Sequence, residues 1–317
     1  MSKPFASTAD TVMPKMEMVQ LTHNVYAVIS GIDPTNGLIV GDTACLVVDT
    51  RATPKLAREL IAAIRTVTDK PIRYIALTHY HAVRTMGYGA FGKDTHVIAS
   101  TGTRDFIMER GAADFESEVR RFPRLFNGVE EIKGLTYPDI TFPDRMSLWC
   151  GNTEVQLINA GKAHTAGDTL IWLPRERIMW GGDIIENNTI PYMGDSFPGD
   201  WPRALEISRA LRPQIVVPGR GGLIKDPKRF DDAVAETNDY ISTIVTAANS
   251  AVASGKTLKE TAAEMRQALK HFGNWPLFEH CFPFNVVRAV DFAQGIPYPR
   301  IWTAERDAAM WNELQAN

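Results

Sequence analysis

The stretch Thr-His-Tyr-His-Ala-Val-Arg at residues 78–84 carries two histidines that directly follow the apolar run at 72–77. In an extended chain, residues i and i+2 lie on the same side of the backbone, so the imidazoles of His79 and His81 can hold one metal ion together. A His-x-His pair alone is a weak signal, because the chain contains seven histidines. Its weight depends on whether other metal-binding residues follow at the ends of other strands.

The surrounding sequence predicts a layered α/β protein with mixed sheets. A helix is expected from Pro54 to about Val67, because Leu56, Leu60 and Ile64 lie on one stripe and proline is tolerated in a first turn. Strand-like runs occupy residues 25–29, 37–40, 45–49, 72–77, 96–100, 140–150, 153–158, 168–173, 177–181 and 214–217. Helical patterns cover residues 103–127, 201–211, 227–254 and 257–270. Strands, a helix, strands again and then helices are typical of this fold class.

Two further residues of metal-binding type follow predicted strands. His164 lies on a glycine-flanked loop after the strand near 155–158, and Asp183 follows the apolar run at 179–182. Three imidazoles and one carboxylate, each at a strand end, suit a borderline ion such as Zn²⁺ or Fe²⁺.

Five motifs together resemble the metallo-β-lactamase superfamily in order and spacing. They are Asp49, Thr-His-x-His at 78–81, Gly-x-x-His-Thr-x-Gly at 161–167, Gly-Asp at 182–183 and Pro-Gly-x-Gly at 218–221. The resemblance covers about residues 18–225 and implies a four-layer αββα sandwich with the metal site along one edge of its two sheets. It implies His79, His81, His164 and Asp183 as metal ligands, and Asp49 as a supporting residue that tethers a ligand loop.

The chain departs from the family pattern at three positions. The family's second motif is usually His-x-His-x-Asp-His, and its Asp and last His are here Val83 and Arg84. The usual Pro-Gly-His is here Pro-Gly-Arg, ending at Arg220. All three replaced residues are ligands of the family's second metal, whereas the ligands of the first are present. The resemblance therefore predicts one metal ion per chain.

The two arginines have two possible roles. They supply the positive charge of the missing ion without titrating, and their planar forks suit an oxyanion. We expect Arg84 and Arg220 to bind an anionic substrate group or the oxyanion of an intermediate, and so to be catalytic together with Asp183. In the alternative, one or both only neutralise Asp183 or Asp49.

The loop at residues 187–193 follows Asp183 and is expected to line the pocket. Its Tyr192, together with Tyr80, predicts contacts with a flat or apolar substrate body. Ordinary core or dimer packing is the alternative for both tyrosines.

The expected organisation has three parts. Residues 1–17 form an N-terminal arm, 18–225 form the metallo-β-lactamase-like core with a helical insertion at about 103–135, and 226–317 form C-terminal helices with an aromatic tail. Such a tail predicts packing on the body or on a second subunit, so a homodimer is expected. Cys45, Cys150 and Cys281 lie far apart without a Cys-x-x-Cys motif, which fits free thiols in a reducing compartment.

Charge and hydropathy limit the kinds of partner and the location that are expected. The net charge is −3 over 317 residues, without a basic run, so no nucleic-acid partner is expected. No apolar run approaches the roughly 18 residues of a membrane span. The first residues lack the apolar segment of a signal peptide, so a cytoplasmic location is expected.

The leading functional hypothesis is a mononuclear, zinc-dependent metallohydrolase that cleaves an ester, lactone, amide or related bond of a small anionic substrate. A bound ion supplies a water of lowered pKa as nucleophile. Some relatives of this fold oxidise sulfur compounds at iron held by His and Asp, so a mono-iron oxygenase using Fe²⁺ is the second hypothesis. A metal-free binding protein that keeps the sandwich is the third, and the retained ligands of the first site argue against it.

Overall fold

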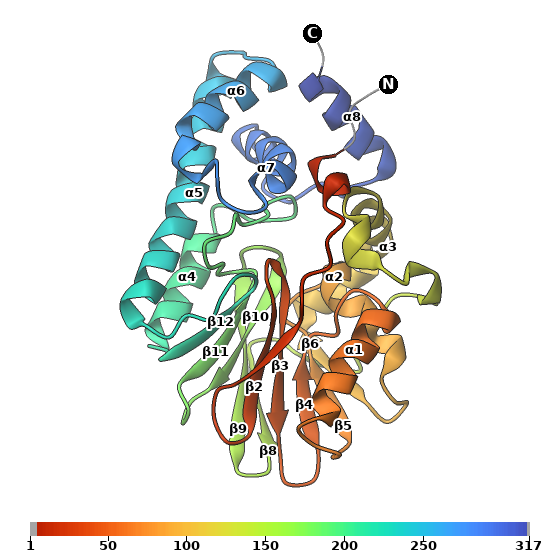
Figure 1. The fold of residues 1–317 in the computed structure, drawn as a ribbon. Helices are drawn as coiled ribbons and strands as arrows, with labels where there is room; N and C mark the ends of the chain where they lie inside the picture. Colours follow the sequence, from red (N-terminus) through yellow and green to blue (C-terminus); the bar gives the residue numbers. More distant parts are fainter. Residues whose placement is uncertain (1–4, 316–317) are drawn as a thin grey trace.

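Two β-sheets pack face to face, with helices on both outer faces (Figure 1). The structure is a computed structural model that describes residues 5–315. The first sheet has the strand order β1-β2-β3-β4-β5-β6-β7, with strands at Glu17–Gln20, Val25–Ser30, Asp33–Val40, Cys45–Val48, Ile72–Ala76, His96–Ser100 and Ile140–Phe142. The second has the order β12-β11-β10-β9-β8, which are Ile215–Pro218, Ile178–Gly182, Ala166–Leu173, Thr153–Lys162 and Arg145–Cys150.

The helices cover the sheets and extend beyond one end of them. They are α1 Pro54–Arg65, α2 Ala82–Thr85, α3 Thr101–Arg121, α4 Trp201–Ala210, α5 Pro227–Ala253, α6 Leu258–Ala268, α7 Phe278–Ala293 and α8 Ala304–Gln315. Short 3-10 turns lie at Ala6–Ala9, Met86–Ala90, Pro123–Phe126, Val129–Glu131 and Lys270–Phe272. In Figure 1, α6, α7 and α8 lie above the sheets, at the end where both described termini are found.

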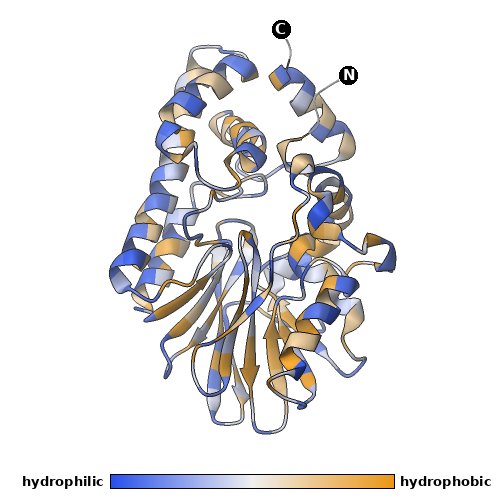
Figure 2. Ribbon diagram, viewed as in Figure 1, coloured by the Kyte–Doolittle hydropathy of each residue, from blue (hydrophilic) through white to orange (hydrophobic). Residues whose placement is uncertain are grey.

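Alternation along the strands builds the layers. On β4, Leu46 and Val48 face the second sheet, where they meet residues such as Leu157 on β9, whereas Val47 faces α1. The apolar colour in Figure 2 follows the strands accordingly. The outer face of the second sheet is covered by α4, α5 and α7 in a third apolar cluster. This is the predicted four-layer αββα arrangement with a helical C-terminal region, and that prediction is confirmed.

Local differences from the sequence prediction have simple causes. The single strand expected at 140–150 is two strands in different sheets, β7 and β8, because Pro143 and Asp144 form a bend between them. Strand β9 extends four residues beyond the expected end at 158, to Lys162. The helical insertion is one long helix, α3, followed by two 3-10 turns.

The aromatic tail packs within its own chain. The tail residues Phe278, Phe282, Phe284 and Trp302 are buried in the cluster over the second sheet. Trp311 on α8 lies against Phe5, with ring centroids 4.9 Å apart. No helix within residues 5–315 combines the length and apolarity that crossing a bilayer requires.

Packing between the sheets gives a first prediction at Gly37 on β3. A Cβ at this position would lie 2.5 Å from the indole of Trp180 on the facing strand β11. We expect Gly37→Ala to lower the free energy of unfolding by about 1–3 kcal/mol, because a buried indole cannot move without disturbing its neighbours. Urea unfolding measures this. The control is Gly92→Ala, where the added methyl has no atom within 4 Å; equal midpoints for both variants would contradict the prediction.

Candidate metal centre

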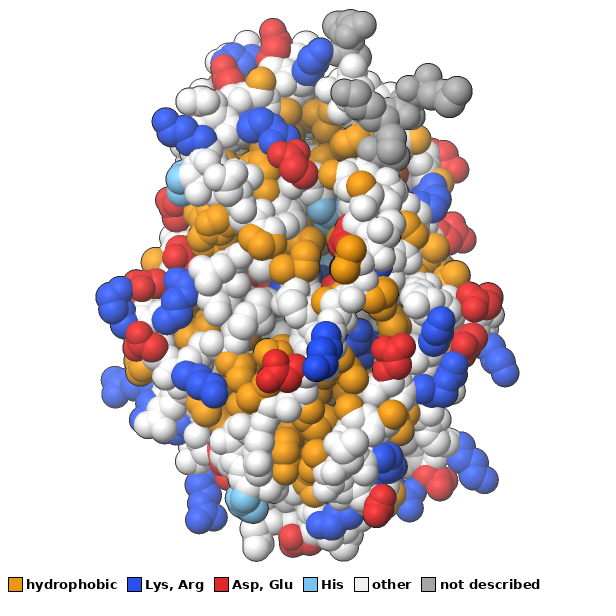
Figure 3. All heavy atoms as spheres, viewed as in Figure 1, with side chains coloured by type: hydrophobic (Ala, Val, Ile, Leu, Met, Phe, Trp, Pro, Cys, Tyr) orange, Lys and Arg blue, Asp and Glu red, His pale blue; other side chains and the backbone are white. Residues whose placement is uncertain are grey.

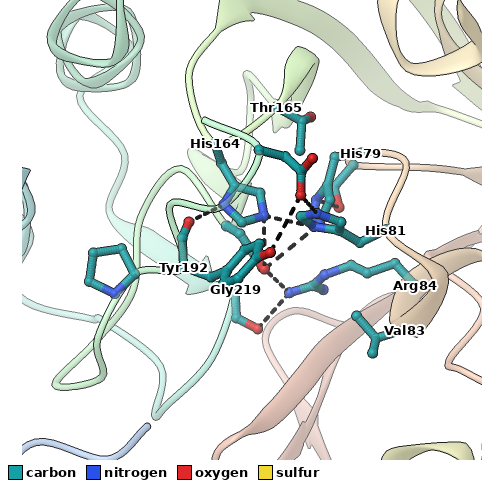
Figure 4. A network of polar contacts seen from close by, with 12 residues as sticks. His79, His81, Val83, Arg84, His164, Thr165, Tyr192 and Gly219 are labelled. Atoms are coloured by element: carbon teal, nitrogen blue, oxygen red, sulfur yellow. Dashed lines mark hydrogen bonds and ion pairs between the residues drawn. The ribbon is translucent and has the colours of Figure 1, made fainter. Parts of the chain in front are cut away.

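Three histidines converge from two loops at the end of the sheets that lies below the C-terminal helices (Figure 4). His79 and His81 lie on the loop between β5 and α2, and His164 lies in the turn between β9 and β10. The ring centroid of His164 is 4.7 Å from that of each of the other two. All three side chains are buried, at 2% exposure or less.

Hydrogen bonds at the far side of each ring fix which nitrogen carries the proton. The hydroxyl of Thr78 donates its proton to Asp49 at 2.9 Å. The hydroxyl oxygen of Thr78 therefore accepts from Nδ1–H of His79, at 3.1 Å. Nδ1 of His164 donates to the carbonyl of Tyr192 at 2.8 Å. Nε2 of His81 lies 3.4 Å from Oδ2 of Asp195. The remaining nitrogen of each ring faces the centre, and on His79 and His164 it is an acceptor.

When all three rings are neutral, the nitrogens that face the centre have no hydrogen-bond donor among them. Nε2 of His164 lies 2.9 Å from Nδ1 of His81, which is a hydrogen bond while His81 carries a second proton and a repulsive contact of two lone pairs once it is neutral. Nε2 of His79 is buried without any hydrogen-bond partner in the described structure. A buried polar atom without a partner is costly, and a metal ion removes that cost here.

Asp183, at the end of β11, completes the donor set. Its Oδ2 lies 3.7 Å from Nε2 of His79 and 3.5 Å from Nε2 of His164. Zinc–ligand bonds of 2.0–2.1 Å place tetrahedral donors about 3.4 Å apart. The residues present therefore fit one borderline divalent ion held by three histidines and one carboxylate.

The electrostatics of the rings differ. Burial lowers the pKa of His164 to about 3 and that of His79 well below its usual value, so both are neutral, as metal ligands must be. Burial also lowers the pKa of His81, but Asp114 and Asp195 outweigh it and raise the value to about 9. Metal binding at His81 therefore releases a proton.

Asp49 holds the loop that carries His79 and His81 through hydrogen bonds to Thr78. Its backbone is in the left-handed region, with φ of 57°, directly after β4. Besides the hydroxyl of Thr78, its carboxylate accepts the backbone N–H of Thr78 at 2.8 Å and Nη1 of Arg84 at 3.0 Å. One carboxylate thus joins the strand end, the ligand loop and the first helix after it.

Arg84 and Arg220 both bind Asp183, but they differ in what else they reach. Arg84 is 1% exposed and binds Asp49, Asp183 and the carbonyls of Thr35 and Gly219. It is not among the residues that line the cavity beside the centre, which favours the neutralising alternative for this residue over substrate contact. Arg220 lies 2.6 Å from Asp183 and does line that cavity.

The cavity beside the centre measures about 30 Å³, the room of about one water molecule. Its lining residues come from the core, from α3 with the following 3-10 turn, and from α7: Ile32, His81, Val83, Glu118, Arg121, Phe122, Leu125, His164, Asp183, Tyr192, Arg220, Leu277, His280 and Cys281. On the face viewed in Figure 3, hydrophobic side chains gather around the hollow beneath the C-terminal helices. The C-terminal region thus contributes directly to the site.

The two tyrosines predicted to bind substrate lie in different places. Tyr192 lines the cavity, and its hydroxyl accepts from Nη1 of Arg121 at 2.8 Å. Tyr80 is 2% exposed and packs edge-on against Phe106 of α3, outside the cavity. The residue between two metal-ligating histidines points away from the centre because alternate residues of an extended loop face opposite sides.

Cys281 is next to His280 at the start of α7, and both line the cavity. Neighbours in a helix are separated by about 100° around the axis, so both can face one space, unlike neighbours in a strand. Burial raises the pKa of the Cys281 thiol to about 12, which favours the neutral thiol over a thiolate nucleophile at neutral pH.

Sequence reasoning missed the acidic residues that hold the ligand loop. On α3, Asp114 accepts the backbone N–H of Ala82 and Glu118 accepts that of Val83, both at 3.1 Å. These are the first residues of α2, directly after His81. Asp114 and Glu118 are spaced i, i+4 and share one helix face, which is the signal that was available. In a charged helix that signal is not distinguishable from a solvated surface.

Comparisons with known proteins agree with this geometry. The sequence profile of the metallo-beta-lactamase superfamily matches residues 31–220. A metallo-beta-lactamase type 2 from Bacillus sp. (strain 170) is 28% identical over 194 residues, which are 59% of this chain and 67% of that protein. A linear primary-alkylsulfatase from Pseudomonas sp. (strain ATCC 19151) is 21% identical over 238 residues, 65% of this chain and 45% of that protein.

A similar fold is found in the inverting sec-alkylsulfatase Pisa1 from Pseudomonas sp. Its structure superposes with a TM-score of 0.71 at 16% identity, covering 87% of this chain and 50% of that one. The chain described here belongs to the metallo-β-lactamase superfamily.

Asp195 gives a prediction about metal affinity. We expect Asp195→Asn to weaken Zn²⁺ binding about 10- to 100-fold, because the carboxylate that orients His81 and raises its basicity is lost. Competition with a chromophoric chelator measures the affinity. Asp105→Asn, on the exposed side of α3, is the control; identical affinities for both variants would show that Asp195 does not support the ligand.

Arg84 gives a prediction about stability. Arg84→Met leaves Asp49 and Asp183 buried without this partner, so we expect a loss of about 3–5 kcal/mol in the free energy of unfolding of the metal-free protein. Urea denaturation followed by circular dichroism measures it. Arg58→Met is the matched control, because Arg58 pairs with Glu131 at the surface and should change little. A stable Arg84→Met protein would refute the neutralising role.

Proposed function

We propose that this chain is a mononuclear metallohydrolase, zinc-dependent, that cleaves an ester, lactone, amide or related bond of a small anionic substrate. The observation that carries the proposal is the convergence of three buried imidazoles, with Nε2 of His79 left without a hydrogen-bond partner in the described structure. Asp183 lies within 3.7 Å of that nitrogen. The named relatives, a β-lactamase and an alkylsulfatase, support hydrolysis as the reaction class.

When bound, the ion would lower the pKa of a water and polarise the scissile bond. Asp183 acts as a ligand in this proposal and not as the proton acceptor. Burial alone would raise its pKa, but Arg220 and Arg84 hold the value well below the usual range. A carboxylate that is so weakly basic stays ionised and is a poor general base.

The arginines support the count of one ion. In the family, the second ion lies beside the carboxylate that Asp183 matches. Here that carboxylate binds Arg84 through Oδ1 and Arg220 through Oδ2. Their charges stand in for the missing ion, and Val83 presents an apolar wall to the cavity where the family has a ligand.

Two other expectations stay proposals. We infer a small-molecule substrate because the cavity is enclosed by the chain's own helices. A homodimer in the cytoplasm remains a prediction from composition and from the aromatic tail, although the buried tail residues named above already pack within one chain. Size-exclusion chromatography with light scattering addresses the oligomeric state.

Metal titration tests the proposed stoichiometry. We expect chelation to abolish hydrolysis of a panel of esters, lactones and sulfate esters, and one equivalent of Zn²⁺ per chain to restore it fully, because the residues present form one ligand set. Elemental analysis and activity are measured on the same samples. Full activity only at two equivalents would refute the single-ion proposal.

The same samples separate the alternatives. Protein that is purified with iron and consumes oxygen in the presence of a thiol would establish the mono-iron oxygenase. Protein that binds neither zinc nor iron tightly would establish the metal-free binding protein.

A further inference from the structure

The cavity beside the candidate metal centre has a wall that lies mostly outside the family motifs. Its apolar part is formed by Ile32, Val83, Phe122, Leu125 and Leu277. Three side chains with hydrogen-bond donors are set into this apolar surface, on three different elements. They are Arg121 at the end of α3, Arg220 after β12, and His280 in the first turn of α7.

Arg121 is buried but keeps donors that are not used. It is 2% exposed, and its guanidinium lies over the rings of Tyr192 and Phe284, at 4.8 and 4.3 Å from their centroids. Nη1 donates to the hydroxyl of Tyr192. Nη2 lies 3.8 Å from Glu118 and 4.0 Å from Asp114, which is beyond hydrogen-bond distance. The hydrogens of Nη2 are therefore available to a ligand.

Arg220 offers donors in the same cavity. Its Nη1 serves both Asp183 at 2.6 Å and Glu186 at 3.0 Å, whereas Nε and Nη2 have no hydrogen-bond partner among the described residues. The planar fork of a guanidinium can bind an oxyanion through Nε and Nη2 while Nη1 stays on the protein.

His280 is the third donor. Within residues 5–315 it has ring contacts with Phe122, at 4.4 Å between centroids, and with Phe284, but no hydrogen bond. Burial, together with the charges of Arg121 and Arg220, lowers its pKa well below the usual value. The neutral ring therefore presents one N–H donor and one acceptor at neutral pH.

We propose that Arg121, Arg220 and His280 form an oxyanion subsite that selects a small monoanion, with a carboxylate or sulfate head and a short apolar body. The apolar body lies against the wall formed by Phe122, Leu125 and Leu277. This inference deepens the proposed hydrolase function, on which it rests for the reaction. The binding step itself depends only on the three side chains.

The charges around the cavity favour an anion. The buried Arg121 and the part-buried Arg220 face it, while Asp183 and Glu118 supply the compensating negative charges. Because Arg121 and Arg220 line the same small cavity, a monoanion bound between them reduces the repulsion of their two positive charges.

A ligand with an apolar body enters only when the wall moves, because the cavity has room for about one water molecule. Leu277, which precedes α7 and carries no capping hydrogen bond, has a left-handed backbone with φ of 67°. A non-glycine residue in that conformation stores strain, so the turn before α7 is the segment that can relax as the ligand enters.

The test compares butyrate with butyramide, which has the same shape without the charge, on chelator-treated, metal-free protein, so that binding to the ion itself does not contribute. Ligand-observed nuclear magnetic resonance gives both dissociation constants. We expect butyrate to bind at least tenfold more tightly than butyramide. Butyl sulfate in a parallel titration shows whether a sulfate head binds better than a carboxylate. Equal binding of butyrate and butyramide would overturn the proposal.

Variants assign the selectivity to its residues. Arg121→Met and His280→Phe should each lower the butyrate preference at least threefold. The controls Arg120→Met and His271→Phe remove exposed neighbours of the same types and should leave it unchanged. If circular dichroism shows that Arg121→Met is unfolded, Arg121→Lys is measured instead. Lysine keeps the positive charge but lacks the planar guanidinium, so we expect a partial loss of the preference for butyrate. Full preference in a folded Arg121 variant refutes the role of that residue.

Failure of this inference differs from failure of the proposed function. Butyrate preference without hydrolysis of any ester would refute the hydrolase and leave the subsite standing. Metal-dependent hydrolysis with equal KM for neutral and anionic esters would refute the subsite and leave the hydrolase standing.

Discussion

The site depends on one electrostatic constraint: two imidazole nitrogens are held 2.9 Å apart inside the protein, so a proton or a metal ion has to lie between them. Neither ring can turn away, because the opposite nitrogen of each is hydrogen-bonded, to Tyr192 in one case and to Asp195 in the other. The backbone supplies the same rigidity, since each ring lies on a loop at a strand end between two packed sheets. A proton on His81 or a bound metal ion satisfies both nitrogens, so the fold holds the candidate ligands in place before an ion would bind.

Asp183 connects this centre to the region where the family holds a second ion. Its two carboxylate oxygens have different partners: Oδ1 binds Arg84, while Oδ2 faces the histidines and Arg220. Arg84 is buried away from the cavity, whereas Arg220 keeps part of its guanidinium toward it. Two replacements that look equivalent in the sequence thus have different environments, because one lies in the short helix α2, packed against α3, and the other follows an edge strand.

Much of the fold could be predicted from the sequence. Periodicity and turn signals located most strands and helices, and the five motifs identified the family. The convergence of His79, His81, His164 and Asp183 follows from their positions at strand ends, which a motif can report. The side chains around them could not be predicted, because α3 and α7 are distant in sequence and their packing on the site depends on tertiary contacts. His280 illustrates this: it had no motif, and only the folding of α7 onto the core brings it to the cavity.

The hydrogen bonds between α3 and the ligand loop also limit how the cavity can open to a substrate. Asp114 and Glu118 hold the backbone of Ala82 and Val83, directly beside a metal ligand, while the end of the same helix carries Arg121 and Phe122 over the cavity. A displacement of α3 large enough to admit a substrate would pull on the loop that holds His81. On the α3 side of the cavity, a movement that admits a substrate would therefore weaken the hold on a metal ion. Entry from the side of α7 would avoid that conflict, so α3 would keep the candidate ligand loop in place while the turn before α7 moves.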